Sequence, residues 1–148
     1  MIQPFSFIGV DPLVITPDNK IVLALRGDDA GAELGKWHIP GALVKADETI
    51  ESAVIRAVKE KTNLDVRLFG GSLQDAFVGM YDALDREPRY RDVALSSLCR
   101  IVVGVSRPSP RMKAVRAFTY EEIATLPVGF DHKQIVLDGF AAFRSRYT

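Results

Sequence analysis

Three charged residues of this chain lie at intervals that one helix could bring together: Glu48, Arg56 and Glu60. Arg56 and Glu60 are four residues apart, a spacing at which opposite charges pair along a helix and contribute roughly 0.2–0.5 kcal/mol. Glu48 lies eight residues before Arg56, across the predicted start of the same helix. A glutamate such as Glu60 has two interpretations. It is a solvated salt-bridge partner, or it supplies the hard oxygen ligands that magnesium requires.

The segment around these residues carries an ordered motif. Residues 37–44, Trp-His-Ile-Pro-Gly-Ala-Leu-Val, resemble the Trp-x-x-Pro-Gly-Gly segment that leads into the Nudix signature. With Glu48 on the first glutamate of that signature, four later positions also match: Arg56, Val58, Glu60 and Leu64. The chain is therefore identified as a Nudix-fold protein with a degenerate Nudix box.

Four positions depart from the signature: Ala42 and Asn63 replace glycines, and Ala57 and Lys61 replace glutamates. The resemblance implies hydrolysis of a nucleoside diphosphate linked to another group, with magnesium bound by glutamates of the box helix. Glu60 is the one glutamate left at the three metal-binding helix positions. An ammonium about 6 Å from a dication costs on the order of 5 kcal/mol at an effective dielectric near 20. The expected cofactor is Mg²⁺ or Mn²⁺, held weakly through Glu60 or absent.

Two groups within the family suggest two kinds of substrate. Residues 85–89 (Asp-Arg-Glu-Pro-Arg) and 130–132 (Phe-Asp-His) are similar to ADP-ribose pyrophosphatase-like members and their regulator relatives. Residues 46–53 are closer to GDP-mannose mannosyl hydrolases. The strand that ends in Arg26 is similar to a family strand that ends in a substrate-facing arginine. The resemblance implies catalytic roles for Glu48, Arg56 and Glu60, a metal ligand in Glu60, and substrate contacts from Arg26, Gly41 and Arg89.

Each of these residues also has a purely structural interpretation. The Glu48–Arg56 pair can hold a loop against the helix, and Arg26 can be an ordinary surface arginine. His38 and His132 can be satisfied by local hydrogen bonds. Ala57 joins the apolar stripe of the helix at no cost.

The elements that position these residues follow from the polarity pattern. Apolar residues at 50, 53, 54, 57 and 58 predict a helix over 49–62, with Thr49 as N-cap and Asn63 in the left-handed C-terminal position. A second helix is predicted over 131–144, started by a capping box of Asp131 and Gln134. Asp11-Pro12 predicts an edge or a bulge in the first strand, because proline cannot donate to a sheet ladder. Extended segments are predicted over 7–15, 21–26, 37–44, 66–69, 73–81, 93–105 and 115–119, with a polar loop over 27–36 and a brief helix over 121–126. This order predicts an α/β (α+β) fold, a mixed β-sheet sandwiched between helices.

Length and composition set the remaining bounds. A chain of 148 residues, 47% hydrophobic and 26% charged, is predicted to form a single domain over 1–148. Nineteen basic and nineteen acidic residues give no general attraction to nucleic acid or to acidic membranes. The single cysteine, Cys99, lies in an apolar stretch and is predicted to be a buried thiol. The N-terminus has no signal-peptide pattern, and no stretch is apolar enough to span a bilayer, so a cytoplasmic location is expected.

These observations leave two main hypotheses. The first is a weak, magnesium-dependent hydrolase of a nucleotide sugar such as GDP-mannose, or of ADP-ribose, with further carboxylates recruited from Glu51, Asp92, Glu121 and Glu122. The second is a non-hydrolytic Nudix domain that binds a nucleotide or a partner protein, which the lost ligands and Lys61 favour. A homodimer kept for assembly is a third possibility.

Overall fold

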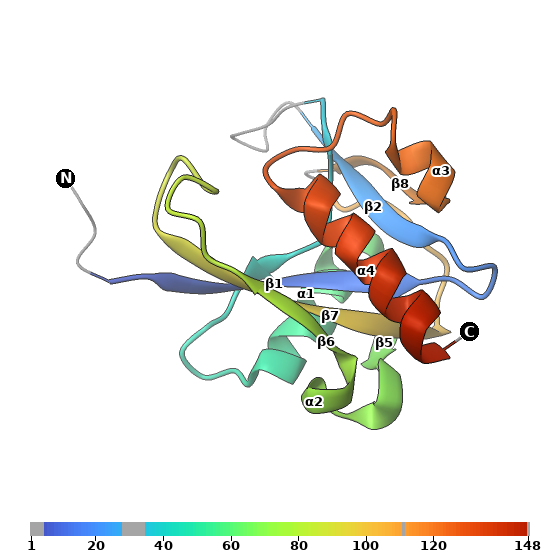
Figure 1. Ribbon diagram of the computed structural model, residues 1–148, viewed down its shortest axis with the longest axis horizontal. Helices are drawn as coiled ribbons and strands as arrows, with labels where there is room; N and C mark the ends of the chain where they lie inside the picture. Colours follow the sequence, from blue (N-terminus) through green and yellow to red (C-terminus); the bar gives the residue numbers. More distant parts are fainter. Residues whose placement is uncertain (1–4, 28–34, 111, 148) are drawn as a thin grey trace.

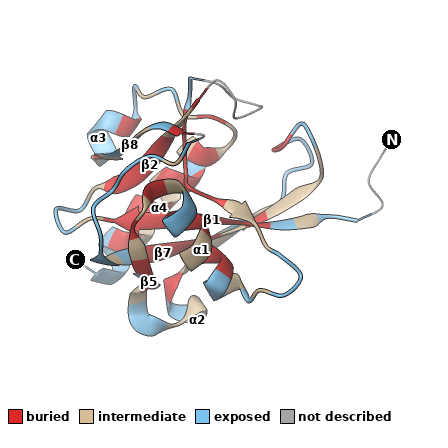
Figure 2. Ribbon diagram, turned by 180° about the vertical axis from the view of Figure 1, so that it is seen from behind, coloured by how far each residue is buried: buried red, intermediate tan, exposed pale blue. Residues whose placement is uncertain are grey.

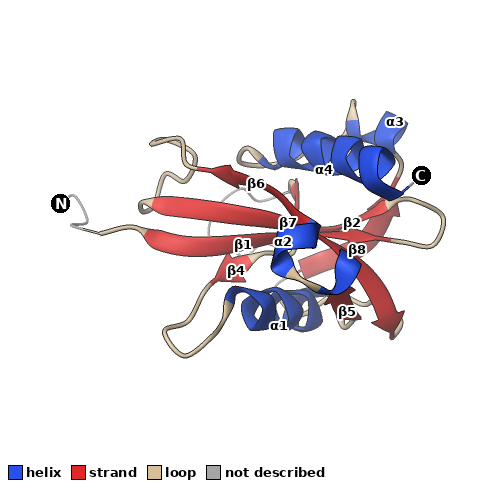
Figure 3. Ribbon diagram, turned by 60° about the horizontal axis from the view of Figure 1, so that its bottom comes forward, coloured by secondary structure: helices blue, strands red, loops and turns tan. Residues whose placement is uncertain are grey.

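The structure, a computed structural model, describes residues 5–27, 35–110 and 112–147. One mixed sheet forms its centre, with α1 (Ile50–Thr62) on one face and α4 (His132–Tyr147) on the other (Figures 1 and 3). The predicted sheet sandwiched between helices is confirmed. No helix of the described residues is long and apolar enough to cross a membrane.

The sheet is organised around one parallel pair, β1 (Phe7–Ile15) and β7 (Asp92–Val103), which pair from Phe7↔Asp92 to Ile15↔Arg100. Its path runs β3-β2-β1-β7-β5, while β4 pairs with β1, β6 with β7 and β8 with β2. The other strands are β2 (Ile21–Arg26), β3 (Trp37–His38), β4 (Ala42–Leu43), β5 (Asp65–Leu68), β6 (Phe77–Tyr81) and β8 (Met112–Phe118).

Pro12 lies inside the sheet, where an edge or a bulge was predicted. The β1–β7 register is continuous through Pro12↔Ser97, so Pro12 forms no bulge against β7, and the edge alternative is the one that applies. On its other side β1 pairs with β4 at Gly9 and Val10, and with β2 at Ile15. No strand pairing is recorded between those points in the described part of the chain, so the missing Pro12 N–H interrupts no ladder there. Asp11 lies in this stretch of β1, which is paired with β7 on one side only.

Two apolar cores, one with α4 and one with α1, hold the helices against the sheet. The buried residues are coloured red in Figure 2. The predicted stripe of α1 packs into one core, and Ala53, Val54, Ala57 and Val58 are each at most 1% exposed. Thr49 caps α1 by accepting a hydrogen bond from the Ser52 N–H, and Asn63 ends it with a φ of 68°. Both α1 caps are as predicted. The other core receives the buried face of α4: Ile135, Val136, Gly139, Phe140 and Phe143.

Two local predictions are wrong because side chains found other partners. The segment 73–81 begins as a helix, α2 (Leu73–Ala76), since the Ser72 side chain accepts from the Asp75 N–H and caps it. At the start of α4, the two side chains of the predicted capping box bind other residues instead of each other's backbone. The Asp131 carboxylate binds Arg86, and Gln134 donates to Asp138. The brief helix predicted over 121–126 is α3 (Tyr120–Ile123), which Thr119 starts with a capping box.

Cys99 is a buried free thiol, as predicted.

Candidate functional site

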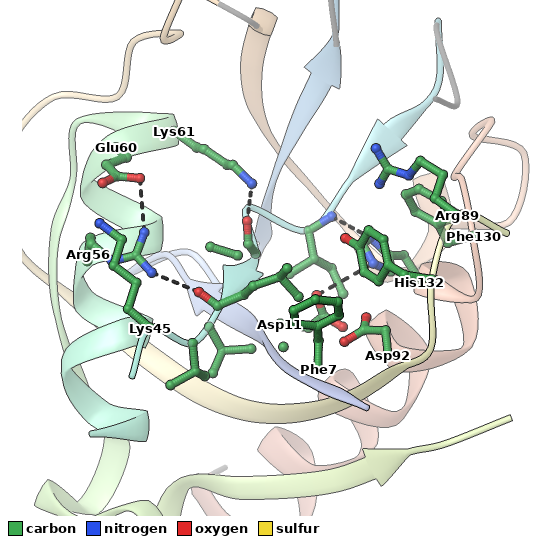
Figure 4. Close-up of a pocket in the computed structure, with 18 of the residues that line it drawn as sticks. Phe7, Asp11, Lys45, Arg56, Glu60, Lys61, Arg89, Asp92, Phe130 and His132 are labelled. Carbon is green, nitrogen blue, oxygen red and sulfur yellow. Dashed lines mark hydrogen bonds and ion pairs between the residues drawn. The ribbon is translucent and has the colours of Figure 1, made fainter. Parts of the chain in front are cut away.

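A cleft of about 540 Å³ opens between the start of β1, the segment after β3, one side of α1 and the turn before α4 (Figure 4). Charged side chains reach it from several elements. Glu60 and Lys61 come from α1, whereas Arg89 and Phe130 lie on the opposite side. Its lining is a mixture of cations (Arg26, Lys45, Arg56, Lys61 and Arg89), carboxylates (Asp11, Glu60 and Asp92) and aromatic rings (Phe7, Tyr90 and Phe130).

The Glu48–Arg56 pair joins the loop after β4 to α1. Arg56 donates from Nε to Glu48 Oε2 at 2.5 Å and from Nη2 to Glu48 Oε1 at 2.8 Å. Nη2 also donates to the Leu43 carbonyl at 2.9 Å, and the Lys45 N–H donates to Glu48 at 2.9 Å. These contacts hold residues 43–48 against the helix. The two predicted catalytic residues therefore bind each other and the backbone, and their catalytic role stays a prediction.

Glu48→Gln is expected to lower stability at neutral pH, with a loss that shrinks in acid. Hydrogen bonds from Arg56 and Lys45 lower the pKa of Glu48 from 4.5 to about 2. Because the folded-state pKa is the lower one, the ionised carboxylate stabilises the fold above pH 4.5 and loses that effect as pH falls toward about 2. Urea unfolding of wild type and variant across this range measures the gap. Glu51→Gln, at an exposed position of α1, controls for the loss of one negative charge. A gap independent of pH would contradict this assignment.

Lys61 points into the middle of the cleft. Its ammonium donates to the carbonyl oxygen of Gly41 (Figure 4). Burial and, to a smaller extent, the neighbouring Arg26 lower the pKa of Lys61 to about 8, a shift that Asp11 opposes. The predicted substrate residue Gly41 thus supplies a carbonyl to this contact, and its side-chain position is filled by Val10 and Asp11.

Cations and aromatic rings alternate on the opposite side of the cleft. The guanidinium of Arg89 lies 5.4 Å from the Tyr90 ring centroid and 6.0 Å from that of Phe130. Arg26 lies 5.7 Å from the same Phe130 ring. Glu87 holds Arg89 with two hydrogen bonds of 2.8 and 3.0 Å. Arg26 and Arg89, which the sequence predicts as substrate contacts, therefore flank one aromatic ring.

A buried ionic cluster, centred on Arg86, adjoins the cleft. Arg86, whose side chain is 4% exposed, donates to Asp131 twice at 2.8 Å and to Asp92 at 2.6 Å. It also lies 3.5 Å from Asp11. Burial raises the pKa of Asp92, and its Oδ1 atom has no hydrogen-bond partner within the described residues. One guanidinium thus serves three carboxylates, two of which line the cleft.

Asp11 is the carboxylate of this cluster that is best placed to exchange a proton. Burial raises its pKa to about 6, a shift that the nearby Arg86 opposes. Its Oδ1 lies 3.5 Å from His132 Nε2, while His132 Nδ1 accepts the Ile39 N–H at 3.0 Å. Burial lowers the pKa of His132 to about 3, so the ring is neutral at physiological pH. With Nδ1 accepting, its proton is on Nε2, toward Asp11.

A model of the NUDIX domain matches residues 7–138 of the chain. The chain belongs to the NUDIX domain family. An ADP-ribose pyrophosphatase of Methanocaldococcus jannaschii is 29% identical over 125 residues, which cover 84% of this chain and 68% of that protein. A MutT-like protein of Streptomyces ambofaciens is 30% identical over 121 residues, or 82% and 69% of the two chains. Family membership and these relatives support hydrolase activity, as the sequence predicts.

Solved structures show the same Nudix fold. An ADP-ribose pyrophosphatase of Streptococcus suis superimposes with a TM-score of 0.74 at 23% identity, covering 97% of this chain and 96% of that one. The NUDIX domain of Shewanella oneidensis NrtR, solved in complex with ADP ribose, also gives 0.74 at 20% identity, with coverage of 99% and 91%. At these identities the likeness establishes the architecture.

The helix that carries the Nudix box, α1, does not offer the carboxylate ligands that the family's divalent cation requires. Ala57 has no ligand atom and is fully buried in the α1 core, as predicted. Glu60 is 54% exposed and lies 3.2 Å from Arg56. Lys61 places a cation at the third position. Among the residues that the structure describes, no group of three or more His, Cys, Asp or Glu side chains is spaced to hold a metal ion.

The structure brings the six predicted site residues to one region, since five of them line the cleft and Glu48 braces its loop. Of the four carboxylates suggested as replacements, Asp92 lines the cleft, whereas Glu122 is used in the α3 cap. Asp11, Arg86, Tyr90 and Phe130 were not predicted as site residues. The signal for Asp11 was available: it is a charged residue inside a run of apolar strand residues, FIGVDPLVI.

Proposed function

We propose that this Nudix protein hydrolyses a nucleoside diphosphate linked to a second group, and that its substrate is ADP-ribose or a close analogue. The observation that carries the proposal is the cleft itself, in which the Lys61 ammonium faces a layer of arginines and aromatic rings. The relatives named as ADP-ribose pyrophosphatases and the ADP-ribose complex of a structural neighbour support this substrate class.

The lining accounts for both parts of such a ligand. A diphosphate requires cationic donors, which Lys61, Arg26 and Arg89 supply from the lining of the cleft. A purine presents a flat apolar face, and the Phe130 and Tyr90 rings offer stacking surfaces beside those cations. The volume of about 540 Å³ is within the range of small-molecule sites.

Asp11 is the proposed general base. A carboxyl group with a pKa of about 6 is largely ionised at neutral pH yet basic enough to accept a proton. It takes a proton from water, the water oxygen forms a bond to one phosphorus, and the bridging P–O bond breaks. The bonding electron pair leaves with the second phosphate, whose developing charge Lys61 stabilises. The neutral His132 and the buried Arg86 hold the Asp11 carboxylate in place.

The metal requirement is a separate part of the proposal. Nudix hydrolases generally use divalent metals, and the sequence predicts Mg²⁺ or Mn²⁺ at Glu60. Because α1 does not offer a matching set of metal ligands, the proposed attack by water and departure of the phosphate are assigned to side chains alone. Glu60→Gln decides the point: its activity falls if Glu60 binds a metal and is unchanged if Glu60 only pairs with Arg56.

Purified protein is expected to convert ADP-ribose to AMP and ribose 5-phosphate, measured by chromatography with magnesium, with manganese and with chelator. GDP-mannose, the other substrate suggested by the sequence, serves as the competing substrate and is expected to be turned over more slowly. ADP-ribose that binds and is recovered intact under all three conditions would instead establish a non-hydrolytic binding domain. The burial of a lysine among the box positions is the observation that favours this second candidate.

The predicted homodimer belongs to the same proposal. Exposed apolar side chains such as Val102 and Val103 on β7 would be covered by a second copy. Sedimentation of the purified protein measures its oligomeric state, and a monomer at all concentrations would contradict the dimer.

A further inference from the structure

We propose that the Lys61 ammonium acts as a built-in cation in this cleft, so that a nucleotide diphosphate binds without a divalent metal. The inference rests on the proposed function for its substrate class. It arises from a disagreement between the family signature and this chain, since the position of a metal-binding glutamate carries a positive charge that points at the site.

The backbone holds this ammonium at a defined place. Lys61 Nζ donates to the Gly41 carbonyl, and the Gly41 N–H in turn donates to the Ile39 carbonyl at 2.7 Å. A Cβ atom at position 41 would collide with the Val10 carbonyl oxygen and with Asp11 Oδ1. The peptide of Gly41 is therefore packed against β1, and it anchors the end of a long, otherwise flexible side chain.

The charge of Lys61 is less neutralised by carboxylates than the charges of Arg56 and Arg89. Arg56 binds Glu48 and Glu60, and Arg89 binds Glu87 in two places. Lys61 binds a neutral carbonyl, and no carboxylate of the described residues forms an ion pair with it. An ammonium has three donors, so two remain for phosphate oxygens after the Gly41 contact.

A metal at this place would compete with Lys61. The ammonium already occupies the Gly41 carbonyl oxygen, and a dication nearby would be repelled by it. Glu60, the surviving box glutamate, is turned toward Arg56 at 3.2 Å. In this chain the Lys61 ammonium, a single positive charge attached to the protein, takes the place of an exchangeable divalent metal and its ligands.

Calorimetric titration of ADP-ribose tests the inference. Wild-type protein is expected to bind ADP-ribose with the same affinity in chelator and in magnesium. Lys61→Met keeps most of the apolar stem of the side chain and removes its charge. It is expected to lower affinity in chelator by about 10- to 100-fold, the effect of losing charged hydrogen bonds. Lys59→Met is the matched control, because Lys59 is on the same helix and binds Asp65 on the surface at 3.1 Å. Its affinity is expected to be unchanged.

Binding by wild-type protein that disappears in chelator and returns with magnesium would overturn the inference while leaving the proposed function intact. This arm requires no variant, so a folding defect in Lys61→Met cannot obscure it. If ADP-ribose does not bind under either condition, the proposed substrate is wrong. Inorganic pyrophosphate then serves as the probe, and equal binding of pyrophosphate to wild type and Lys61→Met in chelator would overturn the inference.

Discussion

Asp11→Asn is expected to lower kcat for ADP-ribose hydrolysis by roughly 10²- to 10⁴-fold, the usual contribution of a positioned general base. Asparagine has nearly the same shape as aspartate, and it can still contact Arg86 and His132. It cannot accept the proton of the attacking water. Affinity for ADP-ribose, measured by calorimetry, is expected to stay within about threefold of wild type, because the diphosphate is bound by other side chains.

The pH profile separates catalysis by Asp11 from a purely structural role. Because burial raises the pKa of Asp11 to about 6, kcat/KM of wild type is expected to fall as pH drops below about 6, where the base is protonated. The residual activity of Asp11→Asn is expected to lack that acidic limb. The charged and titratable groups around Asp11 are Arg86, Lys61, Asp92, Asp131 and His132. If Asp11→Asn keeps the fall of kcat/KM at acidic pH, then one of these other groups produces it.

Arg86→Met is expected to destabilise the fold by about 3–5 kcal/mol, the usual cost of removing one partner from a buried ion pair. The guanidinium is 4% exposed, and it is the cation that binds Asp131 and Asp92 directly. Without it, the buried carboxylates either remain charged and repel one another or take up protons. Methionine fills most of the volume of the arginine side chain. The loss of stability therefore reflects the missing charge more than a change in packing.

Urea unfolding at neutral pH measures this loss. Arg91→Met changes an arginine of the same loop which, within the described residues, donates to two backbone carbonyls at 3.2 and 3.4 Å. It is expected to cost less than about 0.5 kcal/mol. The double variant Arg86→Met/Asp131→Asn is expected to recover part of the stability, since one unpaired charge is removed. An Arg86→Met protein as stable as wild type would mean that the carboxylates are hydrated in the folded state.

Much of the fold could be predicted because its signals are local. The helix α1 begins and ends where Thr49 and Asn63 predict, since a cap depends on backbone groups within a few residues. The short helix α2 was missed because one hydrogen bond, from the Asp75 N–H to the Ser72 hydroxyl, outweighed the extended tendency of the segment. The predicted capping box at Asp131 failed for the opposite reason, because Arg86, 45 residues away, binds that carboxylate.

The sequence by itself determined the family, the order of the main strands and of the helices α1 and α4, and the loss of two box glutamates. These are properties of residue identity and short-range spacing, which the printed chain contains in full. Only the tertiary structure decided what the remaining charged residues do. Glu48 and Arg56 bind each other, Glu60 faces Arg56, and Lys61 reaches Gly41 across 20 residues of chain. Arg86 approaches Asp11 across 75 residues. The energy of such pairs depends on distance and burial, and neither is determined until the sheet has formed.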